Sequence, residues 1–116
     1  MQNCKWDYDD DFDDLAIFKK GHKYCGSIDF DNLILDFTSK GEFMGIEMMD
    51  ATDYLSSLTG EKITKEQLMN IADCDITAVK SGEQLIIRVT LLLKDKTTIK
   101  TAVTAPLLQD KALEYA

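Results

Sequence analysis

The chain has 116 residues, of which 45% are hydrophobic and 29% charged, and its formal net charge is −8. This length suits one domain with a core of its own, and the composition is that of a folded protein rather than a disordered one. No apolar run is long enough to span a membrane, and the opening MQNCKWDYDDD lacks an apolar signal segment, so we expect a cytoplasmic protein without membrane contact.

The negative charge is concentrated in the first half of the chain. Residues 1–58 contain thirteen Asp and Glu against five Lys and Arg, whereas residues 59–116 contain eight of each. An acidic surface repels phosphates, which disfavours nucleic-acid binding, and attracts a basic protein or a cation. Improved solubility is the simpler interpretation of the same charge.

The cysteines favour a reducing compartment. Cys4, Cys25 and Cys74 are odd in number and far apart in the sequence. We therefore expect reduced thiols, which agrees with the cytoplasm.

The first half predicts about four strands, at residues 14–19, 24–30, 33–37 and 43–49. The last two should form a hairpin around Gly41. One register places all the large apolar side chains on one face, with the pairs Phe37–Met44, Leu35–Ile46 and Leu33–Met48. In this register Asp36 lies opposite Gly45, and Asp36 and Glu47 share the polar face.

Two short helices should follow the hairpin. Asp50 is a suitable N-cap for a helix that begins at Ala51. Thr64 and Gln67 form a capping box for a second helix, which should end near Ala72.

The second half predicts three further strands, at residues 76–80, 84–94 and 97–104. The nearly unbroken apolar run at 85–93 indicates a central strand that is covered on both sides along part of its length. Ile99, Val103 and Ala105 alternate with a solvated, Thr-rich side, and Pro106 should open a short C-terminal helix.

The elements together predict an α+β fold. We expect one mainly antiparallel sheet of about seven strands, arranged as two meanders that two short helices separate, with a short helix at the C-terminus. We also expect a single domain over residues 1–116, because neither the acidic half 1–58 nor the extension 59–116 would bury much surface alone.

Two segments resemble a small prokaryotic family of unknown function. Tyr8, Asp9, Asp13, Leu15 and Ile17 match its opening YD-P-E-A-D-A-L-Y-I, and residues 33–36 with 41–51 resemble its second signature, VILDYDEDGRLVGIEILDAS. The match covers residues 6–58, and the residues DD at 10–11 replace the usual Pro-Glu. Members are often encoded beside small toxin-like proteins, so the resemblance implies that this chain acts as the antitoxin-like partner of such a protein. It supplies no catalytic residues.

An acidic cluster near the N-terminus is the alternative site, for a divalent cation or a small ligand. Asp7, Asp9, Asp11 and Asp13 begin like a calcium loop, but Phe12 stands where the loop requires glycine. A solvated acidic loop is the simpler interpretation.

Other combinations are weaker. Asp36 and Glu47 would form a catalytic acid/base pair only in environments that separate their pKa values. His22 and Cys25 supply two of the four ligands that zinc needs, and no phosphate-binding glycine loop is present. We therefore expect no cofactor and no catalytic site.

A binding surface is the remaining hypothesis. Trp6 and Tyr8 precede the acidic run, and with Asp36 and Glu47 they would contact a basic protein, although Trp6 packing beneath a sheet edge is the simpler interpretation. The sequence thus predicts a non-catalytic protein-interaction module with a basic partner, or a homo-oligomer that pairs through sheet edges.

Overall fold

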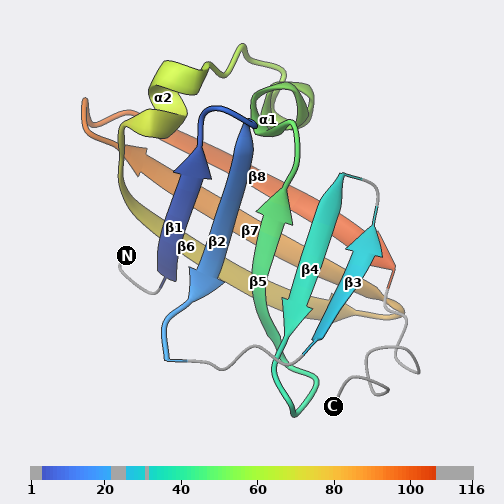
Figure 1. Ribbon diagram of the computed structural model, residues 1–116. Coiled ribbons are helices and arrows are strands. Elements are labelled where there is room, and N and C mark those ends of the chain that lie inside the picture. Colours follow the sequence, from blue (N-terminus) through green and yellow to red (C-terminus); the bar gives the residue numbers. More distant parts are fainter. Residues whose placement is uncertain (1–3, 22–25, 31, 107–116) are drawn as a thin grey trace.

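The computed structural model describes residues 4–21, 26–30 and 32–106 (Figure 1). Within them are eight strands and two short helices. In chain order these are β1 Cys4–Asp9, β2 Asp14–Lys19, β3 Gly26–Phe30, β4 Leu33–Phe37, β5 Phe43–Met48, α1 Ala51–Thr59, α2 Lys65–Met69, β6 Ile71–Ser81, β7 Gln84–Leu93 and β8 Thr98–Pro106.

The strands form two antiparallel sheets. The first has the order β1-β2-β5-β4-β3, and the second has the order β6-β7-β8. Figure 1 shows the three long strands of the second sheet crossing behind the first, with α1 and α2 at one end of both. Inward side chains of the two sheets share one core, which includes Leu15, Ile17, Ile46, Met48, Ile76, Ile87 and Leu91.

The prediction of an α+β fold with a single sheet of about seven strands was wrong. The structure is a two-layer, mainly β arrangement with five and three strands. The first half is also not a meander, because β5 inserts between β2 and β4. Two facing sheets bury one apolar side of each strand, which explains the alternating burial along β2 and β7.

The missing strand is β1, which we had interpreted as an acidic loop. Its sequence CKWDYD alternates apolar and charged residues, and it pairs with β2 from Cys4↔Lys19 to Asp9↔Asp14. Trp6 and Tyr8 pack partly buried against the core, while Lys5 and Asp7 are exposed.

The register of the β4–β5 hairpin was largely as predicted. Leu33 pairs with Met48, Leu35 with Ile46, and Asp36 with Gly45. The expected pair of Phe37 with Met44 was wrong: a bulge shifts the register after Asp36, so Phe37 pairs with Phe43. The two rings make an edge-on contact, with centroids 6.2 Å apart.

The second half follows the predicted three-stranded meander, but its elements begin and end at other residues than predicted. Helix α2 stops at Met69 instead of near Ala72, and β6 begins at Ile71 rather than at Ile76. Strand β7 is central, as predicted, but its burial alternates, with Arg88 exposed on the outer side.

Strand β8 also differs at its end. Ile99, Val103 and Ala105 are buried, as expected for the inner side. Pro106 closes the strand opposite Gln84 and does not start a helix there. This place suits a proline, because β8 is an edge strand and the missing N–H costs no ladder bond on its open side. The rest of the predicted C-terminal helix lies outside the described residues.

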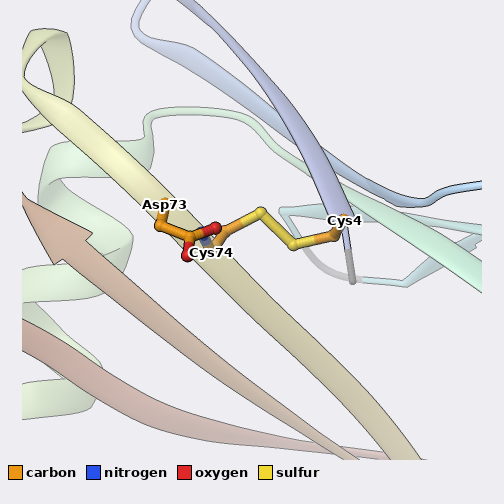
Figure 2. The surroundings of a disulfide bond; sticks show 3 residues. All are labelled: Cys4, Asp73 and Cys74. Atoms are coloured by element: carbon orange, nitrogen blue, oxygen red, sulfur yellow. A yellow bond between two sulfur atoms is a disulfide. The ribbon is translucent and has the colours of Figure 1, made fainter. Parts of the chain in front are cut away.

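A disulfide joins the two sheets. Cys4 of β1 and Cys74 of β6 are both buried and bonded, with Cα atoms 5.9 Å apart and 70 positions between them in the sequence (Figure 2). Beside it the Asp73 carboxylate accepts a hydrogen bond from Cys74 N at 2.8 Å. The expectation of reduced thiols was therefore wrong for this pair, because the facing sheets bring distant cysteines together. Cys25 lies outside the described residues.

Neither described helix could cross a membrane, since α1 and α2 are too short and too polar for this.

Candidate functional site

The outer face of the first sheet faces away from the second sheet and is the strongest candidate surface (Figure 1). Strand pairing fixes which side chains share it. One row across the sheet consists of Lys5, Phe18, Gly45, Asp36 and Ser27, and the next row consists of Asp7, Ala16, Glu47, Ile34 and Asp29. In these two rows carboxylates outnumber the single lysine by four to one.

Asp36 lies in the middle of this face and is 0% exposed. Its Oδ1 atom accepts a hydrogen bond from the Ser27 hydroxyl at 2.7 Å, across the β3–β4 pair. Its Oδ2 atom is also buried and has no hydrogen-bond donor among the described residues. A buried oxygen without a donor is costly, so this atom needs a proton or a cation from a neighbouring group. Asp36 thus lies on the face that the register predicted, but it is buried there rather than solvated.

Glu47 is that neighbouring group. It pairs with Ile34 and is therefore diagonal to Asp36 on the same face. Burial raises the pKa of Glu47 to about 7, and a hydrogen bond to Asp36 and the charges of Asp36 and Asp14 add to the rise. Two ionised carboxylates have no proton to share, so the bond exists when Glu47 is protonated and donates to Asp36.

Gly45 makes room for an aromatic ring beside this pair. A Cβ atom at position 45 would lie 2.7 Å from Cδ1 of Phe18 and 2.8 Å from the carbonyl oxygen of Ile17. Gly45 is opposite Asp36, as the register predicted. The close contacts at Gly45 come from β2 on its other side, where the Phe18 ring lies over the glycine.

Asp13 has a structural role. Its φ angle is 55°, and its carboxylate accepts hydrogen bonds from Thr52 N at 3.2 Å, from Thr52 Oγ1 at 2.6 Å and from the Tyr8 hydroxyl at 2.6 Å. Burial alone would raise the pKa of Asp13, but the bonds from Thr52 and Tyr8 outweigh it and lower the pKa. For Tyr8, burial and then the bond to Asp13 raise the pKa above its ordinary value.

Asp13 therefore caps α1 from another part of the chain. Its carbonyl oxygen also accepts from Ala51 N at 2.8 Å. Asp50, which we had expected to cap this helix, precedes it with a φ of 50° and makes no side-chain cap bond. The predicted capping box of Thr64 and Gln67 is confirmed for α2.

The aspartates that we predicted as cation ligands do not form one site, and they have different roles in the structure. Asp7 is exposed on β1, Asp9 Oδ1 accepts from Asp11 N at 3.0 Å, and Asp13 holds α1. Residues 4–21, 26–30 and 32–106 contain no group of three or more His, Cys, Asp or Glu that could hold a metal ion. His22 and Cys25 are outside the described residues.

The four residues of the predicted interaction surface do not form one surface. Trp6 and Tyr8 are in register with the core residues Ile17 and Leu15, so they face inward. Asp36 and Glu47 face outward. Gly45 was already expected opposite Asp36. Ser27 and Phe18, which the sequence did not connect with this site, lie in the same row as Asp36.

Comparison with known proteins gives two partial similarities. A protein of Methanosarcina mazei described as a putative hypoxanthine phosphoribosyltransferase is 36% identical over 67 residues, which cover 58% of this chain and 50% of that protein. An uncharacterized protein of Methanocaldococcus jannaschii is 38% identical over 48 residues, which cover 41% of each chain. The chain thus spans half or less of the relatives it matches. No protein-family model and no solved structure matches it.

Proposed function

We propose that this chain is a non-catalytic protein-interaction module that binds a basic protein across the outer face of its five-stranded sheet. The observation that carries the proposal is the charge of this face. Asp7, Asp29 and Glu47 occupy one row, Asp36 lies in the next, and Lys5 is the lone basic residue of the two rows. The face has no second layer of described strands or helices over it (Figure 1).

The composition of the face also fits protein binding. Ala16, Phe18 and Ile34 lie half-buried between the carboxylates. Partly apolar surfaces that also carry charged groups are common in protein interfaces, and acidic groups steer a basic partner. The resemblance of residues 6–58 to a family found beside toxin-like proteins adds an antitoxin-like role to this proposal.

Charge reversal on the face tests it. Asp7→Lys with Asp29→Lys changes two exposed carboxylates on the edge strands β1 and β3, and Glu61→Lys with Glu83→Lys is a matched reversal on exposed positions elsewhere. We expect capture from a lysate of the source organism to give a basic partner that binds the wild type and the control. The outer-face variant should lose it, and added salt should weaken it. Equal capture by both variants would contradict the proposal.

A homo-oligomer is the second candidate, because β1 and β3 are the terminal strands of their sheet. Light scattering during size-exclusion chromatography separates the two. A stable dimer that persists in the outer-face variant would favour edge pairing over a basic partner.

The name of the Methanosarcina relative offers phosphoribosyl transfer as an enzymatic alternative. We do not favour it for this chain, since a phosphorylated substrate would meet repulsion from the acidic outer face. Cytoplasmic localisation remains part of our proposal, although the Cys4–Cys74 disulfide counts against it, because a reducing cytoplasm would open this bond. Alkylation of the free thiols at the moment of cell lysis tests it: Cys4 and Cys74 found oxidised in cells would contradict a cytoplasmic location.

A further inference from the structure

The Asp36–Glu47 pair has a buried oxygen that only a proton or a cation can satisfy. Asp36 is 0% exposed, Ser27 occupies its Oδ1, and its Oδ2 lacks a donor among the described residues. Glu47 lies diagonally beside it and is partly exposed, so the pair is accessible from the face through Glu47.

We propose that Asp36 and Glu47 form a subsite for one guanidinium group, supplied by an arginine side chain of the basic partner. This inference rests on the proposed function and specifies which contact gives it selectivity. In the free protein below about pH 7, Glu47 holds a proton and donates it in the hydrogen bond to Asp36. The guanidinium replaces that proton, which is released from Glu47 to solvent.

The chemistry of the pair favours guanidinium over a metal ion. Ca²⁺ takes six to eight oxygen ligands and Mg²⁺ takes six, whereas the described residues offer no third carboxylate, His or Cys that would complete a metal site. A guanidinium has several N–H donors in one plane and can bridge two carboxylates.

An aromatic ring in the same row as Asp36 adds to this preference. Phe18 lies over Gly45, which is opposite Asp36. A planar cation stacks well on an aromatic face. The subsite therefore combines two carboxyl groups, one hydroxyl and one ring, from β2, β3, β4 and β5.

The side chains around the subsite carry mostly negative charges, which repel anions. Asp14 on β2 acts on Glu47 through space, and Asp7 and Asp29 end the row of Glu47 on β1 and β3. Lys5 on β1 ends the row of Phe18. A cation that enters the subsite therefore reduces a net negative charge.

A small probe tests the subsite without the partner. The Glu47 carboxyl carbon is followed by NMR during pH titration of the labelled full chain, in ethylguanidinium chloride, in tetramethylammonium chloride and in sodium chloride at equal ionic strength. We expect ethylguanidinium alone to lower the titration midpoint of Glu47, by about 0.5 or more, which is a threefold or larger loss of proton affinity. Tetramethylammonium has no N–H donor and should match sodium.

Variants locate the effect. Asp36→Asn should abolish the response to ethylguanidinium, and Asp29→Asn on the same face should keep it. If Asp36→Asn does not fold, Ser27→Ala, which frees Oδ1 of Asp36, should alter the response instead. Equal midpoints in the three salts, or equal lowering by both organic cations, would overturn the subsite.

The result is separable from the proposed function. Partner capture without a guanidinium response would remove the subsite and leave the interaction face intact. A guanidinium response without any basic partner would support the subsite chemistry and count against the protein-interaction module.

Discussion

The carboxyl groups of Asp36 and Glu47 occupy diagonal positions on neighbouring strands, where two full charges repel. A shared proton removes the repulsion and gives the buried Oδ2 of Asp36 a donor. Deprotonation of Glu47 removes both benefits at once. The pair therefore links the stability of the fold to pH near neutrality.

We expect the wild type to lose stability as the pH rises from 5 to 8. The folded pKa of Glu47, about 7, is above its ordinary value of 4.5, so between these values the folded state binds more protons than the unfolded state. Its free energy of unfolding should fall by about 1–2 kcal/mol over this range, after allowance for solvent screening at a partly exposed group. Denaturant unfolding at several pH values measures it.

Glu47→Gln should make the curve nearly flat, because its amide donates to Asp36 at every pH. At pH 8 this variant should be more stable than the wild type. Asp29→Asn, at the exposed end of the same row, is the control and should keep the wild-type slope. Asp13 does not disturb this window, since the stability from its lowered pKa is lost only at more acidic pH. Parallel curves for wild type and Glu47→Gln would refute the shared proton.

The sequence contained part of this site. The hairpin register correctly placed Asp36 opposite Gly45 and on the same face as Glu47. It did not reveal that Asp36 is buried, because burial on an outer face depends on neighbours from other strands, such as Ser27 of β3, which bonds to Asp36. Ile34 was the available signal: an apolar residue next to Asp36 on the polar face indicates that this face is not fully solvated.

At the level of elements, α1 depends on Asp13, which lies 38 positions before Ala51, the first residue of the helix. Asp13 and Asp50 both have positive φ, but of the two only Asp13 bonds to the helix through its side chain. Asp50 contributes only its carbonyl oxygen, which accepts from Tyr54 N. A sequence pattern assigns caps to the nearest suitable residue, and Asp50 was the natural choice. The turn between β1 and β2 instead brings Asp13 to the start of the helix. This contact could not be predicted because the acidic residues of β1 had been interpreted as a loop.

Asp13→Asn and Asp50→Asn form a matched pair, since asparagine tolerates the left-handed conformation at both positions. We expect Asp13→Asn to lower the free energy of unfolding by about 1–2 kcal/mol, because it loses charged acceptor bonds at the helix start and to Tyr8. Asp50→Asn should change it by less than about 0.5 kcal/mol. Equal losses in the two variants, measured by urea unfolding, would show that Asp13 is not the cap.

The disulfide connects elements that belong to different sheets. Because Cys4 and Cys74 are 70 positions apart, the bond closes a long loop in the unfolded chain, and we expect reduction to destabilise the protein by about 2–4 kcal/mol. Cys4→Ser with Cys74→Ser should be insensitive to reductant. Peptide mapping after alkylation of the unfolded, unreduced protein should find both cysteines unmodified. Alkylation of both would show that the bond is absent.

At the scale of the whole molecule, the predicted strand positions were close for β2, β4, β5 and β7, but their assembly was not. Local alternation predicts strands and hairpins, whereas the pairing of β2 with β5 is a long-range contact without a local signal. The division into two sheets has no local signal either. After β5 the chain passes through α1 and α2 and then forms the second sheet. A linear sequence favours meanders because neighbours in sequence are the simplest partners.

One shared core implies one unfolding unit. Inward residues of both sheets belong to the same cluster, and Cys4 on β1 is bonded to β6. Trp6 on β1 is the single tryptophan, so its fluorescence reports on the first sheet, while far-UV circular dichroism reports on all strands. In urea the two signals should change with one midpoint, because neither sheet keeps its apolar face covered when the other unfolds.

The Cys4→Ser and Cys74→Ser double variant should still show coincident curves at a lower midpoint, because packing as well as the bond joins the sheets. A tryptophan transition at clearly lower urea than the circular-dichroism transition would mean that the first sheet unfolds independently, and residues 1–58 and 59–116 would then be two units rather than one.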